Sequence, residues 1–77
     1  MTFQELQRVV LARDLPEHGL QRGDMGTIVA LYTPDGVEVE FVRFSGETQA
    51  LVTLNVRDVR AAQADELPAA RQLRRSA

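Results

Sequence analysis

The chain has 77 residues, of which 44% are hydrophobic and 26% charged, a composition typical of one small globular domain. A domain of this length buries only about 60% of the surface of its unfolded chain, which leaves little room for an enclosed catalytic pocket. The absence of cysteine excludes disulfides, thiolate catalysis and cysteine-based zinc sites. These limits favour a binding domain over an enzyme, and we expect no cofactor and no metal.

The charge balance is acidic, with nine basic and eleven acidic residues, and every basic residue is an arginine. An acidic excess argues against a dedicated nucleic-acid-binding protein, because neutralising phosphates requires a basic surface. No apolar run has the length of a signal peptide or of a membrane-spanning helix, and a cysteine-free chain suits a reducing compartment. We therefore expect a cytoplasmic protein with no membrane partner.

The first part of the chain predicts two strands separated by a long loop. A capping-box pattern in the first five residues allows at most one helical turn, and β-branched residues then predict a strand over residues 8–13. A proline ends this strand and leaves residues 14–24 as a loop. Gly23 and Gly26 bracket the entry to a second strand over residues 26–32, where we expect a bulge or a close backbone approach. Because this second strand is apolar on both faces, the pattern leaves open which face is buried.

The middle of the chain predicts a hairpin. An Asp-Gly pair after a proline marks a tight turn at residues 33–36. The following strand, over residues 37–43, alternates between apolar and acidic residues, so its apolar side chains face the core while Glu38 and Glu40 share the other face. Paired carboxylates also serve glycoside hydrolysis, but no cleft-forming sequence surrounds these two, which favours a solvated strand face.

The remaining elements complete the plan of a small barrel. Residues 48–54 predict a fourth strand, residues 55–58 a single helical turn, and residues 59–61 a last short strand. This order predicts an all-β fold, namely a small five-stranded SH3-like barrel that is partly open. Even partial closure of the sheet removes most unpaired strand edges. We expect the barrel to span residues 1–60 and to be followed by a disordered tail or frayed helix over residues 61–77, which a proline interrupts.

The acidic body of the chain favours binding to another protein that has a basic surface. Residues 1–60 hold six arginines against nine acidic residues, whereas the tail holds three against two. The candidate partner-binding residues lie in the long first loop, in the hairpin turn and on the wet face of the third strand. They are Asp14, Glu17, His18, Asp35, Glu38 and Glu40.

An alternative hypothesis is a nucleic-acid-binding or ribosome-associated module. Three arginines, Arg43, Arg57 and Arg60, are expected near one end of the barrel, with Phe44 as an exposed stacking residue. Tyr32 is expected to be taken up by the core, which leaves few aromatic side chains for stacking. Because such binding neutralises phosphates, this hypothesis predicts a steep dependence on salt.

A third, enzymatic hypothesis depends on the single histidine. His18 follows Glu17 and lies near Asp14, a combination found at metal and acid–base sites. A flexible loop lacks the rigid support that such sites need, so a surface histidine is the favoured interpretation. Catalysis would require a pocket formed between subunits, and the sequence leaves the oligomeric state open.

Several blocks of the sequence resemble a family of small bacterial proteins known only as a domain of unknown function. The blocks are Arg-Asp-Leu-Pro-Glu-His-Gly-Leu at 13–20, Gly-Asp-Met-Gly-Thr-Ile-Val at 23–29, Val-Glu-Val-Glu-Phe at 37–41 and Gly-Glu-Thr-Gln-Ala-Leu-Val-Thr-Leu at 46–54. The resemblance covers nearly all of residues 5–60, and it implies an SH3-like fold without an established activity. By analogy with other small bacterial proteins of this type, we expect an antitoxin-like or accessory partner of a larger protein.

A shorter and more distant similarity concerns the entry to the second strand. The pattern Gly-Asp-x-Gly-Thr-Ile at 23–28 is similar to the glycine and β-branched core of KOW-type barrels in ribosomal proteins and transcription elongation factors. It implies the RNA-associated alternative, although KOW barrels that bind RNA are basic and contain lysine, unlike this chain.

Overall fold

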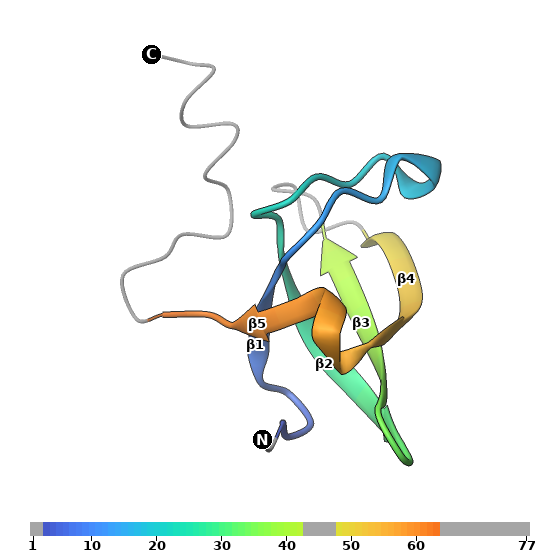
Figure 1. Ribbon diagram of the computed structural model, residues 1–77. Helices are drawn as coiled ribbons and strands as arrows, with labels where there is room; N and C mark the ends of the chain where they lie inside the picture. The colour runs from blue at the N-terminus through green and yellow to red at the C-terminus, as the bar shows by residue number, and fades with distance from the viewer. Residues whose placement is uncertain (1–2, 43–47, 64–77) are drawn as a thin grey trace.

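The computed structural model describes residues 3–42 and 48–63 of the chain, which form five strands and two single-turn 3-10 helices. The elements in chain order are β1 (Arg8–Leu11), η1 (Pro16–His18), β2 (Met25–Tyr32), β3 (Gly36–Val42), β4 (Thr48–Asn55), η2 (Val56–Asp58) and β5 (Val59–Ala61). All strands belong to one antiparallel sheet in the order β4-β3-β2-β1-β5 (Figure 1). The predicted all-β class, the five strands and the helical turn before the last strand are confirmed.

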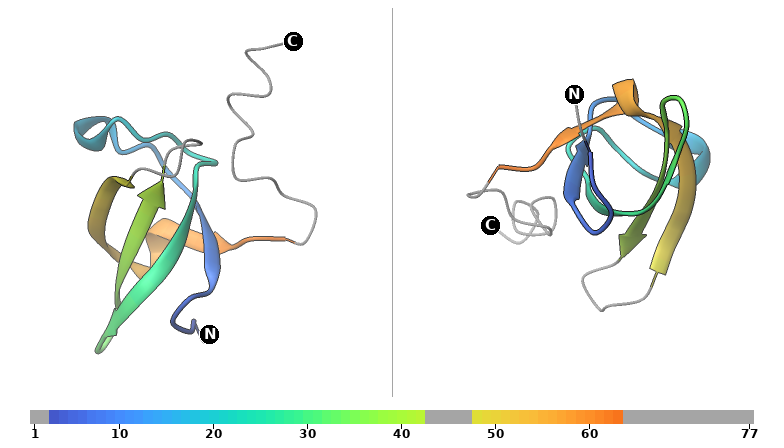
Figure 2. Two further views of the ribbon diagram at one scale, coloured as in Figure 1. Left: turned by 180° about the vertical axis from the view of Figure 1, so that it is seen from behind. Right: turned by 90° about the horizontal axis from the view of Figure 1, so that it is seen from below.

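The sheet curls around a common interior but does not close. Figure 2 shows the strands surrounding this interior, with η2 crossing from β4 to β5. Within the described residues β4 pairs only with β3 and β5 only with β1, so the barrel is open between its first and last strands. The partly open barrel is therefore confirmed, and one consequence is that the eight-residue β4 keeps a free edge.

The interior is filled by alternate residues of the strands. On β3 the side chains of Val37, Val39 and Phe41 are at most 2% exposed, as the alternation predicts. Val52 and Leu54 lie directly opposite them on β4 and are also buried. The complete core comprises Phe3, Val9, Leu11, Leu15, Leu20, Ile28, Val37, Val39, Phe41, Val52, Leu54 and Val59.

The ambiguous strand, β2, is half in the core and half outside it. Ile28 is fully buried opposite Val39, and a register shift then makes Val29 an extra residue of the strand. Beyond this bulge Leu31 and Tyr32 are 43% and 48% exposed. The expectation that Tyr32 lies in the core is therefore wrong. The reason is that the extra residue Val29 shifts the alternation, so that Tyr32 lies opposite Gly36 on the outer face, the same face as Glu38.

The long loop between β1 and β2 is held by several contacts. Leu15 and Leu20 form an isolated antiparallel bridge and bury both side chains in the core. Between them η1 ends at Gly19, which has a φ of 69°, a conformation that glycine adopts without strain. The Asp14 carboxylate accepts a hydrogen bond from the backbone amide of Arg22 at 2.8 Å. The loop thus has an ordered shape rather than being a loose connection.

Element boundaries differ from the predictions by one or two residues. The first strand ends at Leu11 rather than at residue 13, because the amide of Ala12 turns to the carbonyl of Asp58. The predicted tail over residues 61–77 falls outside the described residues beyond position 63, as does Thr2 of the expected capping box. Within the described part of the chain no helix is long and apolar enough to cross a membrane.

The inner side of Gly26 is filled by side chains of β3. A Cβ at this position would lie 2.6 Å from Cγ1 of Val39 and 2.8 Å from Cε1 of Phe41, which is closer than carbon atoms pack. Gly26 thus excludes a Cβ, but the excluding atoms belong to side chains of β3 rather than to the predicted bulge or backbone approach. At Gly23 the requirement is conformational instead, since its φ is 95° and no atom lies within 4 Å of the Cβ position.

We expect Gly26→Ala to lower the free energy of unfolding by roughly 1–3 kcal/mol, because the added methyl group overpacks the contact with Val39 and Phe41. Gly36→Ala is the matched control, since its Cβ would meet Tyr32 Cβ at an ordinary 3.4 Å. Urea denaturation of both variants measures the difference. Equal stability of the two variants would contradict the packing described here.

Candidate functional site

The strongest candidate site is the outer face of strands β2, β3 and β4. It consists of two carboxylates on β3, those of Glu38 and Glu40, together with Tyr32 on β2 and Thr48 and Leu51 on β4; these five residues are called the acidic face below. The Tyr32 hydroxyl donates to Oε1 of Glu38 at 2.5 Å, and the Thr48 hydroxyl donates to Oε2 of Glu40 at 2.8 Å. Each carboxylate is therefore held in place by one hydroxyl group.

The sheet register explains why these side chains meet. Glu38 lies opposite Ala30 on β2, so Tyr32 is its diagonal neighbour on the same face, within reach of a long side chain. Glu40 lies opposite Leu51 on β4. The period of two that buries the apolar residues of β3 thus sends both carboxylates to the outside.

The acidic face carries negative charge that no described residue neutralises. Both glutamates are half-buried, and among the residues that the structure describes no arginine pairs with either carboxylate. The hydrogen bond to Glu38 raises the pKa of Tyr32, because ionised tyrosine could not donate it, and burial and the nearby negative charge raise it further. Tyr32 therefore remains a hydrogen-bond donor throughout the physiological pH range.

Apolar side chains flank the two carboxylates. Leu51 is 56% exposed, and Val42, which pairs with Thr48, is 51% exposed. Exposed aliphatic residues beside fixed charges are typical of protein-binding surfaces, where the apolar contacts add to the charged ones. The arrangement suits a ligand with a cationic group next to an apolar one.

The other predicted partner-binding residues do not join this face. Asp35 lies in the turn between β2 and β3, where its carboxylate accepts from the Asn55 side-chain amide at 3.1 Å and its carbonyl accepts from the amide of Val56 at 2.9 Å. Asp14 is likewise engaged in holding the first loop. Both carboxylates therefore have a structural role that their sequence positions did not reveal.

The loop residues Glu17 and His18 are exposed on η1. In Figures 1 and 2 this helix and the β2–β3 hairpin turn lie at opposite ends of the molecule. The six predicted residues are therefore spread over the molecule rather than gathered at one surface. Within the described residues no group of three or more histidine, aspartate and glutamate side chains is placed to hold a metal ion.

The predicted nucleic-acid site is only partly visible. Arg43 and Phe44 lie outside the described residues. Arg57 belongs to η2 and donates from Nε to the Asn55 side-chain oxygen at 3.3 Å, whereas Arg60 belongs to β5 and donates to the carbonyl of Ala61 at 3.3 Å. The predicted stacking contact of Phe44 with these two arginines therefore lies outside the described residues.

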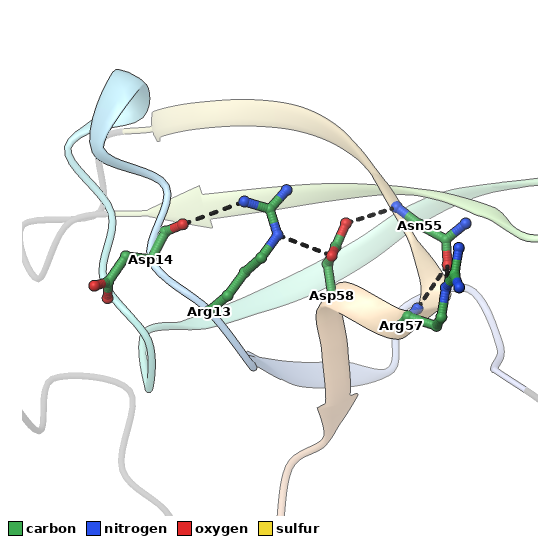
Figure 3. A network of polar contacts seen from close by, with 5 residues as sticks. All are labelled: Arg13, Asp14, Asn55, Arg57 and Asp58. Carbon is green, nitrogen blue, oxygen red and sulfur yellow. Dashed lines mark hydrogen bonds and ion pairs between the residues drawn. The ribbon is translucent and has the colours of Figure 1, made fainter.

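A polar network that joins distant parts of the chain was missed at the sequence level (Figure 3). Arg13 Nε donates to Oδ1 of Asp58 at 2.9 Å, and its NH1 reaches the carbonyl of Asp14 at 3.3 Å. The other Asp58 oxygen accepts from the amide of Asn55 at 3.2 Å, and the Asn55 side chain accepts from the amide of Arg57 at 2.9 Å. The bond from the Asn55 amide to Asp58 belongs to a capping box, in which the Asn55 side chain also accepts from the backbone of Asp58; the Asn-x-x-Asp spacing of residues 55–58 could have revealed it.

The network has a clear electrostatic signature. The hydrogen bond from Arg13 lowers the pKa of Asp58, and the Asn55 amide and the charges of Arg13 and Arg57 lower it further, against the opposing effect of burial. The same contact raises the pKa of Arg13. The ion pair therefore fastens the end of β1 to the helical turn that precedes β5.

Residues 5–61 match the family described as a domain of unknown function, DUF4926. The chain belongs to this family. The DUF4926 match ends at Ala61, the last residue of β5, so it includes the whole sheet, both 3-10 helices and the acidic face. No curated protein and no solved structure matches the chain significantly.

We expect the Asp58 carboxylate to make stability depend on acid pH. Because its pKa is lowered by folding, Asp58 stabilises the protein fully above the ordinary aspartate pKa of about 3.9, and this contribution is lost as the pH falls through the lower folded-state pKa. The free energy of unfolding should decline less steeply on acidification in Asp58→Asn than in the wild type. Denaturant titrations at a series of acid pH values measure the slopes.

Arg13→Gln provides the second arm of this experiment, because it removes the donor that lowers the Asp58 pKa most. We expect it to flatten the acid dependence as Asp58→Asn does, and the double variant to add little. If Arg13→Gln kept the full wild-type slope, the ion pair would not be the source of the effect.

Proposed function

We propose that this protein is a non-enzymatic protein-binding module that uses its acidic face to bind a basic surface of another protein. The observation that carries the proposal is the pair of half-buried glutamates, each held by a hydroxyl donor, with no described arginine to neutralise them. Half-burying two like charges on one strand face is unfavourable for the isolated domain. A cationic ligand would relieve that cost.

The chemistry of the site favours arginine or lysine side chains as the ligand groups. The hydroxyl donors occupy one oxygen of each carboxylate, so Oε2 of Glu38 and Oε1 of Glu40 have no donor among the described residues. Charge-assisted hydrogen bonds to such oxygens are shorter and stronger than neutral ones. The neighbouring Leu51 and Val42 side chains would contact the aliphatic stems of these residues or an apolar neighbour.

The architecture and size of the domain support a binding role. The strand order, with a single helical turn before β5, supports an SH3-like barrel, and in such small folds function resides on the surface rather than in an enclosed pocket. We therefore propose an antitoxin-like or accessory role, in which the acidic domain covers a basic surface of a larger bacterial protein.

Affinity capture from the native cytoplasm tests the proposal. The tagged wild type and the double variant Glu38→Gln/Glu40→Gln are used as baits, each with and without nuclease, and captured proteins are quantified by mass spectrometry. We expect a stoichiometric protein partner that survives nuclease, and at least roughly tenfold weaker binding to the double variant, because its charge-assisted bonds are lost. Binding should also weaken with salt.

The matched control is Glu5→Gln/Glu17→Gln, which changes the net charge equally at exposed positions away from the acidic face. We expect it to retain wild-type binding. An equal loss of partner binding in both double variants would show that net charge, rather than the acidic face, determines binding. Unchanged binding of Glu38→Gln/Glu40→Gln would refute the proposed site. Nucleic acid or ribosomal proteins lost on nuclease treatment would favour the alternative of a nucleic-acid-binding module.

A further inference from the structure

The free edge of β4 is the longest stretch of the sheet without a neighbouring strand. β4 has eight residues and pairs with β3 along one side. Within the described part of the chain, no backbone hydrogen bond joins residues 48–54 to any element other than β3. The other edge strand, β5, has only three residues. No strand among residues 3–42 and 48–63 therefore uses the backbone groups along the open edge of β4, which can pair with another strand.

Most of β4 lacks the features by which edge strands avoid pairing, although a register shift near its start makes Gln49 an extra residue between Thr48 and Ala50. Its sequence, Thr-Gln-Ala-Leu-Val-Thr-Leu-Asn, contains no charged residue and no proline. Its register with β3 runs without a shift from Ala50 to Asn55. Near the middle of the strand, Leu51 is 56% exposed on the outer face. From Ala50 onward the edge is uncharged and regular and carries an exposed leucine, which leaves it open to pairing with another chain.

We infer that β4 pairs antiparallel with β4 of a second copy of this chain, with the two-fold axis at Leu51. In this register Leu51 lies opposite Leu51 of the second copy, so the two exposed leucines cover each other. Ala50 then lies opposite Val52 of the second copy, on the inner face. In a self-complementary interface each residue faces the same surface of the second copy, so like charges would repel each other. Since β4 carries no charge, the symmetric pairing avoids this repulsion.

The symmetry of this dimer determines where the acidic faces lie. Two antiparallel strands of a continuous sheet are related by an axis perpendicular to the sheet, so both outer faces point to the same side. Glu40 lies directly opposite Leu51 within each copy. The Glu40 residues of the two copies would then be three strand spacings apart, about 14 Å at roughly 4.8 Å per spacing. The dimer would present one extended surface with two copies of the acidic face.

Single-cysteine cross-linking of the full chain tests the pairing, because the wild type contains no cysteine. Residues directly opposite in antiparallel strands have Cα atoms about 4.5–5.5 Å apart, which a disulfide can bridge. We expect Leu51→Cys to form a covalent dimer under mild oxidation. In Thr53→Cys the two cysteines would be four residues out of register, about 13 Å apart, and should remain unlinked.

Leu31→Cys is the control for random collision, since Leu31 is comparably exposed but lies on the interior strand β2. Equal rates of cross-linking in the three variants would overturn the pairing, as would faster linkage of Thr53→Cys than of Leu51→Cys. Circular dichroism of each variant verifies that the fold is retained.

Sedimentation equilibrium of the unmodified protein provides an independent measurement. We expect a concentration-dependent monomer–dimer equilibrium that Leu51→Lys abolishes, because two ammonium groups would meet at the axis, and that Leu31→Lys retains. A wild type that stays monomeric at about 1 mM, a concentration at which even weak specific contacts associate, would overturn the inference. That result would leave the proposed binding of a basic partner intact, since a single copy contains the complete acidic face.

Discussion

Strand β3 lies between β2 and β4 and can give only alternate residues to the core, and the rest of the structure depends on this constraint. Val37, Val39 and Phe41 fill the interior. The absence of a side chain at Gly26 on β2 leaves space for Val39 and Phe41. The same alternation leaves Glu38 and Glu40 on the outside, where neighbouring strands supply one hydroxyl donor to each. The core and the candidate site are therefore two consequences of one pattern.

The acidic residues of the chain have two different roles. Asp14, Asp35 and Asp58 accept hydrogen bonds from backbone amides or side chains and fix the first loop, the hairpin turn and η2 relative to one another. The glutamates of β3 are different, because only side-chain hydroxyls hold them and their charge is not neutralised by a described residue. The candidate binding residues therefore differ from the structural ones in their hydrogen-bond donors and in the neutralisation of their charge, rather than in acidity itself.

The fold could be predicted from local patterns, but much of the site could not. The alternation of β3, the Asp-Gly turn and the helical turn at residues 55–58 are properties of adjacent residues, and the structure places these elements within one or two residues of expectation. The ion pair between Arg13 and Asp58 joins residues 45 apart in sequence, so no local pattern reveals it.

Other differences have equally physical causes. The exposure of Tyr32 depends on the bulge at Val29, which changes which residues of β2 share a face and turns Tyr32 outward. The structural roles of Asp14 and Asp35 depend on backbone amides that only the folded chain brings near. Charge and type of residue therefore identified six candidates, and three-dimensional contacts were needed to separate them.

The most direct measurement of the central claim is the amide NMR spectrum of the labelled protein as its captured partner is added. Binding through the acidic face predicts that the largest shift changes fall on residues of β3 and β4 around Glu38, Glu40 and Leu51, while η1 is unaffected. Changes centred instead on η1, or on Arg57 and Arg60, would contradict the account and place the binding surface elsewhere on the barrel.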